Sequence, residues 1–124
     1  MIRKVGQIML YVNDQDKSRD FWTEKLGFRI VSEGSLGEMK WIEVGPADAE
    51  TSIVLHNKEL VARMSPGLNL GTPSLMFFTD DLDRLYGDLK NKNVNVGEIV
   101  TMPTGRVFNF SDDEDNYFAV MERQ

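Results

Sequence analysis

The sequence has no cysteine and a single histidine, His56. Without cysteine the chain can have no disulfide, thiolate nucleophile or Cys-based metal site, and this composition is consistent with a reducing cytoplasm. The sequence also shows no nucleophile triad, phosphate-binding glycine loop or dinucleotide fingerprint. These absences leave three classes open: a small-molecule binder, an enzyme with an unusual site, and a protein-interaction module.

Positive charge and long hydrophobic runs are also scarce. The chain has 14 Lys and Arg against 20 Asp and Glu, and its net charge of −6 repels phosphate backbones and anionic lipid surfaces. The apolar run near the N-terminus, Ile8 to Val12, is too short for a signal-peptide core or a membrane span. We therefore expect a cytoplasmic, unprocessed protein that binds neither nucleic acid nor membranes.

The sequence does contain a regular order of strands and helices. A chain of 124 residues is typical of one compact domain. Alternation of apolar and polar residues predicts strands, and helical periodicity predicts helices, the first of which has Gly27 as its C-cap. In chain order we expect a strand at 5–12, a helix at 16–26, strands at 28–33, 39–45, 51–56 and 74–79, a helix at 82–92, and strands near 94–100, 105–110 and 117–122.

The same order of elements occurs twice, which indicates an internal duplication. When Gln7–Lys17 is laid over Ser74–Arg84 at a constant offset, three positions are identical: Met9 and Met76, Asp14 and Asp81, and Asp16 and Asp83. The predicted fold class is α+β, with two tandem βαβββ modules in one domain that spans 1–124. Module one is expected at about 1–57 and module two at about 74–124, joined by a linker at about 58–73 that contains Pro and Gly.

The stretch "QIMLYVNDQDKSRDFWTEKLGF", Gln7 to Phe28, resembles the opening module of the vicinal oxygen chelate superfamily. This superfamily includes glyoxalase I, bleomycin-resistance proteins, fosfomycin-resistance enzymes and extradiol dioxygenases. The C-terminal "FNFSDDEDNYFAVME" is similar to the family's Phe-x-Asp-Pro-Asp-Gly-Asn ending, with Asp113 and Asp115 in place of its Pro and Gly. The resemblance covers essentially the whole chain.

In that superfamily two βαβββ modules form a curved mixed sheet whose concave face holds a ligand, and a symmetric partner chain often completes it. The resemblance therefore implies a homodimer and a small-molecule ligand. Strand alternation then assigns side chains to the concave face. The expected ligand-binding residues are Gln7, Met9, Tyr11, Val54, His56, Ser74, Met76, Phe78, Tyr117 and Ala119. Because several of these are Met or aromatic, we expect an aromatic or amphipathic ligand.

Metal-binding members of the superfamily use one inward position on the first strand and one on the last strand of each module. Carried over by the motif, these positions are Gln7, Val54, Ser74 and Ala119. Val54 and Ala119 cannot coordinate a metal, and a neutral serine hydroxyl is a poor substitute for imidazole. The resemblance and these residues together predict no metal at the family site and no cofactor.

Two alternatives stay open beside a metal-free small-molecule binder. His56 with Gln7 and Glu122 could form a shifted site in a metal-dependent lyase, transferase or dioxygenase, and Gln7 and His56 are the candidate catalytic residues for such an enzyme. The apolar face could instead serve a protein-interaction module. The binder is favoured because losing charged ligands while keeping an aromatic lining removes catalysis but keeps hydrophobic binding.

Overall fold

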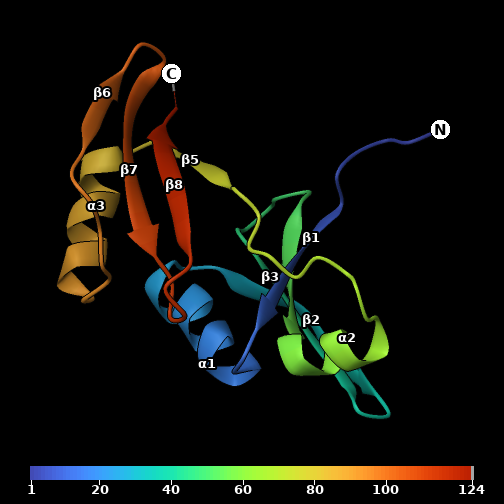
Figure 1. The fold of residues 1–124 in the computed structure, drawn as a ribbon. Coiled ribbons are helices and arrows are strands. Elements are labelled where there is room, and N and C mark those ends of the chain that lie inside the picture. The colour runs from blue at the N-terminus through green and yellow to red at the C-terminus, as the bar shows by residue number, and fades with distance from the viewer. Residues whose placement is uncertain (124) are drawn as a thin grey trace. The chain divides into compact units, whose positions relative to one another are not determined.

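The computed structural model describes residues 1–123 as an α+β protein built from two tandem units (Figure 1). The first unit spans Met1–Thr72 and the second spans Pro73–Gln124, and each contains one mixed four-stranded sheet. This confirms the predicted class with two βαβββ modules. No helix within residues 1–123 is long and apolar enough to cross a membrane.

The first unit contains β1 (Gln7–Val12), α1 (Gln15–Asp20), the π-helical turn η1 (Phe21–Lys25), β2 (Arg29–Leu36), β3 (Met39–Gly45), β4 (Ser52–Asn57) and α2 (Lys58–Met64). Its sheet has the order β1-β4-β3-β2, in which β1 runs parallel to β4 and the other pairs are antiparallel. Alternation sends one set of side chains into the core, where they are buried with Trp22: Leu10, Val12, Ile42, Val44, Ile53 and Leu55. Helix α1 packs on β3 and β4, on the side of the sheet where these buried side chains lie.

Local interactions fix the position of α1 against the sheet. Asp14 is the N-cap, and its carboxylate accepts a hydrogen bond from the Lys17 amide, which satisfies a donor at the helix start. The next side chain, Gln15, donates from Nε2 to the carbonyl oxygens of Lys40 (2.8 Å) and Leu55 (2.9 Å). These bonds join the helix start to β3 and β4.

The second unit contains β5 (Met76–Thr79), α3 (Leu82–Asn91), β6 (Val100–Met102), β7 (Gly105–Ser111) and β8 (Tyr117–Glu122). Its sheet order, β5-β8-β7-β6, repeats that of the first unit, as the internal duplication predicts. Its core joins α3 to one sheet face through the buried residues Leu82, Leu89, Phe108, Phe110, Phe118 and Val120. Asp81 caps α3 by accepting from the Arg84 amide, as Asp14 caps α1.

Several elements differ from the expectation, among them β2, which ends at Leu36 instead of at residue 33. The expected linker contains α2, whose N-cap Asn57 accepts from the Leu60 amide. The helix has only seven residues and buries only Leu60, so its hydrophobic period is too short to detect. The strand expected near 94–100 is the shorter β6, and β5 begins at Met76 rather than at Ser74. Boundaries of short strands depend on pairing, which sequence alone specifies weakly.

Arg106 on β7 forms the main ion-pair cluster of the second unit. Its guanidinium donates to both carboxylate oxygens of Asp83, at 3.1 and 3.0 Å, and to both of Glu122, each at 2.9 Å. These hydrogen bonds hold the pKa of Asp83 and the pKa of Glu122 below their usual values. Arg106 thus links the first turn of α3 to the sheet, and its donors are occupied by these two carboxylates.

The turn between β7 and β8 contains Asp113 and Asp115, which replace the Pro and Gly of the similar family ending. Asp112 is buried, and its carboxylate accepts from the amides of Glu114 and Asn116, both at 2.9 Å. Burial raises the pKa of Asp112. Asp115, where the family has Gly, adopts φ = 60°, a left-handed conformation that costs energy for a residue with a Cβ.

Asp115→Gly is therefore expected to stabilise the protein by about 0.5–1 kcal/mol, because glycine adopts positive φ without a steric penalty. Urea unfolding measures the effect. Asp115→Ala is the matched control: it removes the same charge but keeps a Cβ, so it should bring no gain. Equal stability of the two variants would contradict the backbone argument.

Candidate functional site

The face of the first sheet opposite α1 carries a group of polar and aromatic side chains, and we call this face the open face. Strand register places them opposite one another across the four strands, because residues paired in a sheet point to the same side. The open face consists of Gln7, Met9 and Tyr11 on β1, Ser32 and Gly34 on β2, Trp41 and Glu43 on β3, and Ser52, Val54 and His56 on β4.

Glu43 is the centre of a hydrogen-bonded cluster on the open face. Its Oε1 accepts from the Ser32 hydroxyl at 2.9 Å, and its Oε2 accepts from the Ser52 hydroxyl and from Gln7 Nε2 at 3.2 Å. The hydrogen bond from Ser52 is the main cause that lowers the pKa of Glu43, with Ser32 and Gln7 adding to it. Glu43 is therefore a carboxylate at neutral pH.

An aromatic row lies beside this cluster. Tyr11 and His56 are paired across β1 and β4, and their rings stack with centroids 6.0 Å apart and an interplanar angle of 26°. Trp41 is the cross-strand neighbour of His56 on the other side. His56 Nε2 lies 3.2 Å from Met9 Sδ, and burial lowers the pKa of His56, so its imidazole is neutral at pH 7.

The Trp41 indole lies directly over Gly34 on the neighbouring strand. A Cβ added at Gly34 would be 2.2 Å from a carbon of the Trp41 ring, so only glycine allows this close approach. The glycine lets the ring lie against β2, while the stacked rings of Tyr11 and His56 belong to β1 and β4 on the same face. These three rings, which we call the platform, give the open face aromatic surface suited to a planar ligand.

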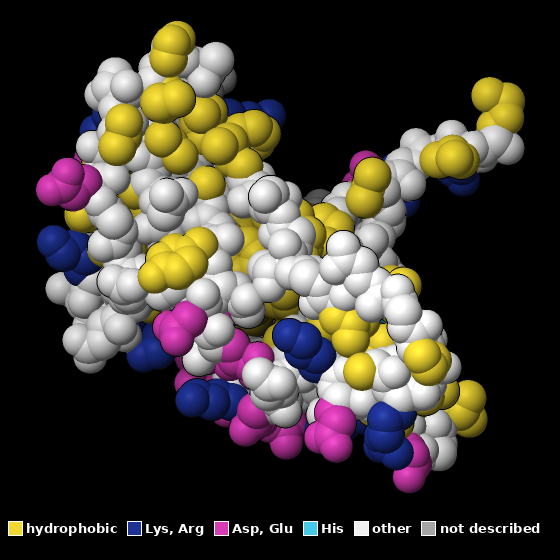
Figure 2. Space-filling view, in the orientation of Figure 1, with side chains coloured by type: hydrophobic (Ala, Val, Ile, Leu, Met, Phe, Trp, Pro, Cys, Tyr) yellow, Lys and Arg dark blue, Asp and Glu magenta, His cyan; other side chains and the backbone are white. Residues whose placement is uncertain are grey.

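The face of the second sheet that lies opposite α3 is more apolar than the open face. Its strands expose large side chains: Met76 at 48%, Phe78 at 69% and Tyr117 at 62%. A hollow of about 340 Å³ is lined by Ser74, Leu75, Met76, Asn109, Tyr117, Phe118 and Ala119. A second hollow of about 500 Å³ is lined by Phe78, Thr104, Met121, Glu122 and Arg123. Hydrophobic side chains gather on this unit near the turn between β6 and β7 (Figure 2).

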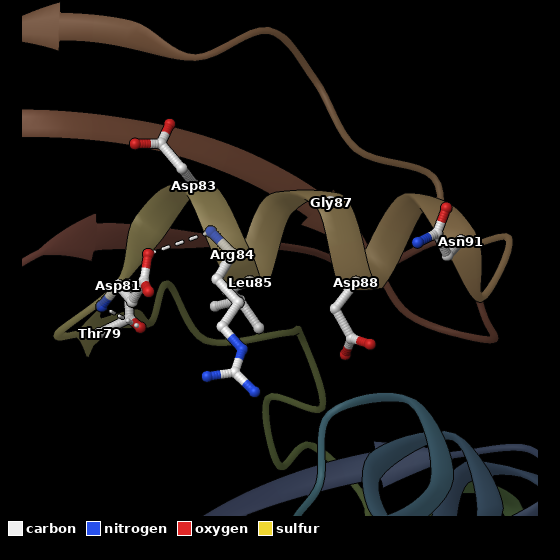
Figure 3. Close-up of a pocket in the computed structure, with 8 residues that line it drawn as sticks. All are labelled: Thr79, Asp81, Asp83, Arg84, Leu85, Gly87, Asp88 and Asn91. Carbon is white, nitrogen blue, oxygen red and sulfur yellow. Dashed lines mark hydrogen bonds between the residues drawn. The ribbon is translucent and has the colours of Figure 1, made fainter.

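A larger hollow, of about 610 Å³, runs along α3 (Figure 3). Two of its carboxylates already have structural roles: Asp81 caps the helix by accepting from the Arg84 amide, and Asp83 pairs with Arg106. No side chain predicted to bind ligand lines it. The two sheet faces are therefore better candidate sites than this helix surface.

The sequence-predicted residues fall into one group in each unit. Gln7, Met9, Tyr11, Val54 and His56 share the open face of the first unit, and Ser74, Met76, Tyr117 and Ala119 line one hollow of the second, while Phe78 lines the other. Sequence reasoning missed Glu43 with its partners Ser32 and Ser52, and it left Trp41 undecided. The alternation in "EMKWIEVG" puts Trp41 and Glu43 on one face, but only the pairing of β3 with β4 says which face that is.

The fold agrees with the comparisons to known proteins. The family model described as "Glyoxalase/Bleomycin resistance protein/Dioxygenase superfamily" matches residues 4–120, and the chain belongs to this superfamily. The protein is 36% identical to the uncharacterized protein YetH of Bacillus subtilis (strain 168), over 98% of this chain and 100% of YetH.

Two solved structures extend the comparison. TnmS3, an antibiotic binding protein from Streptomyces sp. CB03234, matches with a TM-score of 0.86 and 29% identity, over 99% of this chain and 98% of TnmS3. A superfamily member from Sphaerobacter thermophilus DSM 20745 matches with a TM-score of 0.85 and 29% identity, over 98% of both chains. The fold is thus shared over nearly the whole chain.

The residues that the resemblance assigns to metal positions, Gln7, Val54, Ser74 and Ala119, are a poor set of metal ligands. Val54 and Ala119 offer no donor atom, and the Gln7 carboxamide donates to Glu43. Across residues 1–123 no group of three or more His, Cys, Asp or Glu side chains is arranged to hold a metal. The proposed shifted site gains no support either, because both oxygens of Glu122 accept hydrogen bonds from Arg106.

Proposed function

We propose that the protein binds a small planar or amphipathic molecule without a metal ion. One observation carries the proposal: the sheet faces present Met and aromatic side chains, while Val54 and Ala119, two of the positions that the resemblance assigns to metal ligands, have no donor atom in their side chains. Burial of such side chains against a ligand is favourable by roughly 1–3 kcal/mol each. Binding of this kind needs shape and apolar area rather than a reactive group.

The comparison with TnmS3 supports this proposal. TnmS3 is described as an antibiotic binding protein, and it shares the fold over 99% of this chain at 29% identity. Since one fold supports several activities, this similarity gives a class of ligand and not its identity. We also expect two chains to pair, because exposed apolar side chains such as Phe78 are favourable at an interface. The cytoplasmic location stays a prediction.

Acridine, a planar aromatic molecule that is neutral near pH 7.5, tests the proposal. We expect calorimetry on protein dialysed against a chelator to show saturable binding, unchanged when Zn²⁺, Ni²⁺, Mn²⁺ or Fe²⁺ is added. Tyr11→Ala should weaken binding by about tenfold, because one ring of the platform is lost.

Leu68→Ala is the matched control, because Leu68 is exposed but lies outside both sheets. It should leave acridine affinity unchanged. Metal retained at one ion per chain after dialysis, or binding that requires added metal, would instead favour the metal-dependent enzyme. Absence of saturable binding would favour the interaction module.

A further inference from the structure

The carboxylate of Glu43 has an acceptor site that the protein does not use. A carboxylate offers about four lone-pair sites for hydrogen bonds. Within residues 1–123, Ser52 and Gln7 both donate to Oε2, and Ser32 alone donates to Oε1. One site on Oε1 therefore stays open to a further donor. The three side-chain donors also hold the carboxylate in a fixed orientation, so a ligand group would meet a preorganised acceptor.

No cationic side chain among the described residues neutralises Glu43. On β3, Lys40 Nζ lies 2.6 Å from Asp16, and Arg19 on α1 contacts Asp16, Asp20 and Glu33. Among the described residues Arg29, on β2 opposite Gly45, forms no ion pair with Glu43. The hydrogen bonds that lower the pKa of Glu43 all come from neutral groups, Ser52 first, with Ser32 and Gln7. A partly buried charge without a counterion gains most from a cationic partner, since a charge-assisted hydrogen bond is stronger than one between neutral groups.

The open face supplies a surface for the remainder of such a ligand. Trp41 and Glu43 are two residues apart on β3 and point to the same side, so their Cα atoms are roughly 7 Å apart along the strand. A planar molecule stacked on Trp41 can therefore bring a nitrogen substituent at its edge to Glu43. The imidazole of His56 is neutral near pH 7 and does not repel a positive charge. The net charge of −6 also attracts cations to the protein.

We propose that Glu43 is a specificity-determining residue that pairs with a protonated nitrogen on the ligand, so that the protein prefers cationic aromatic molecules. The proposal rests on the proposed function and adds the charge of the ligand to it. Neither the superfamily's metal positions nor the exposed apolar side chains predict this preference. The preference depends on one carboxylate supplied by β3.

Three compounds with the same ring system test the charge preference. At pH 7.5, 9-aminoacridine is cationic, acridine is neutral and acridine-9-carboxylate is anionic. We expect calorimetry on the unaltered protein to rank them in that order, with the cation bound about tenfold or more tightly than acridine. This ranking needs no variant, so it does not depend on how a substitution affects folding.

Glu43→Gln keeps the side chain's size and removes its charge. We expect it to weaken 9-aminoacridine binding by about tenfold and to change acridine affinity by less than about twofold. Glu33→Gln is the matched control: it removes an equal charge from β2 on the opposite face, since Glu33 pairs with the buried Ile42. It should leave the ranking intact.

Each outcome decides between the proposals. Loss of the cation preference in Glu43→Gln but not in Glu33→Gln supports the inference. Equal binding of the three compounds to the unaltered protein, or equal losses in both variants, overturns the inference and leaves the proposed function standing. If none of the three compounds binds, both proposals are wrong.

Discussion

Replacing Phe110 by alanine is expected to lower the free energy of unfolding by about 3–5 kcal/mol, as large-to-small changes of buried aromatic residues do. Phe110 is fully buried on the helix-facing side of the second sheet. Its ring lies 5.8 Å from that of Phe118 and 6.3 Å from that of Phe77, so the variant leaves a cavity between aromatic neighbours. Urea unfolding followed by circular dichroism measures the loss.

Phe78→Ala provides the matched control, because it makes the same substitution in the same sheet on the opposite face. Phe78 is 69% exposed, so its truncation should change the unfolding free energy of the isolated chain by less than about 1 kcal/mol. A loss that grows with protein concentration would indicate that a second chain covers Phe78. Equal losses in Phe78→Ala and Phe110→Ala at low concentration would contradict the assignment of the two faces.

Replacing Gly34 by alanine is expected to displace the Trp41 ring and to weaken acridine binding by about tenfold or more. The added Cβ would lie 2.2, 2.6 and 2.8 Å from three atoms of the indole, closer than non-bonded carbon atoms approach. Moving the ring away from the row breaks the platform, and the crowding should destabilise the protein by about 1–3 kcal/mol. Near-ultraviolet circular dichroism measures the change in the environment of the Trp41 ring, and calorimetry measures the acridine affinity.

Gly6→Ala is the control for adding a methyl group to a glycine of the same unit. A Cβ at Gly6 would meet no atom within 4 Å, so the variant should keep both the Trp41 signal and acridine binding. If Gly34→Ala binds acridine with unchanged affinity, Trp41 does not form part of the binding surface. The platform would then be limited to Tyr11 and His56.

The order of strands and helices and the division of each strand into two faces were predictable from the sequence. The duplication of Gln7–Lys17 at Ser74–Arg84 predicted two modules, and the structure has the same sheet order in both units. Alternation in β1 placed Leu10 and Val12 in the core and Met9 on the other side, as observed. These features were readable because side-chain direction along a strand is a local property with a period of two.

Which side chains meet on the open face depends on the tertiary structure. Gln7, Ser32 and Ser52 come from three strands far apart in the sequence, and they converge on Glu43 only because hydrogen-bonded register sets them opposite one another. Register is a property of strand pairs, and a slip of one residue would turn Glu43 to the other face. The pairing of β2, β3 and β4 therefore identifies the Glu43 carboxylate as a candidate ligand group, which the sequence alone does not.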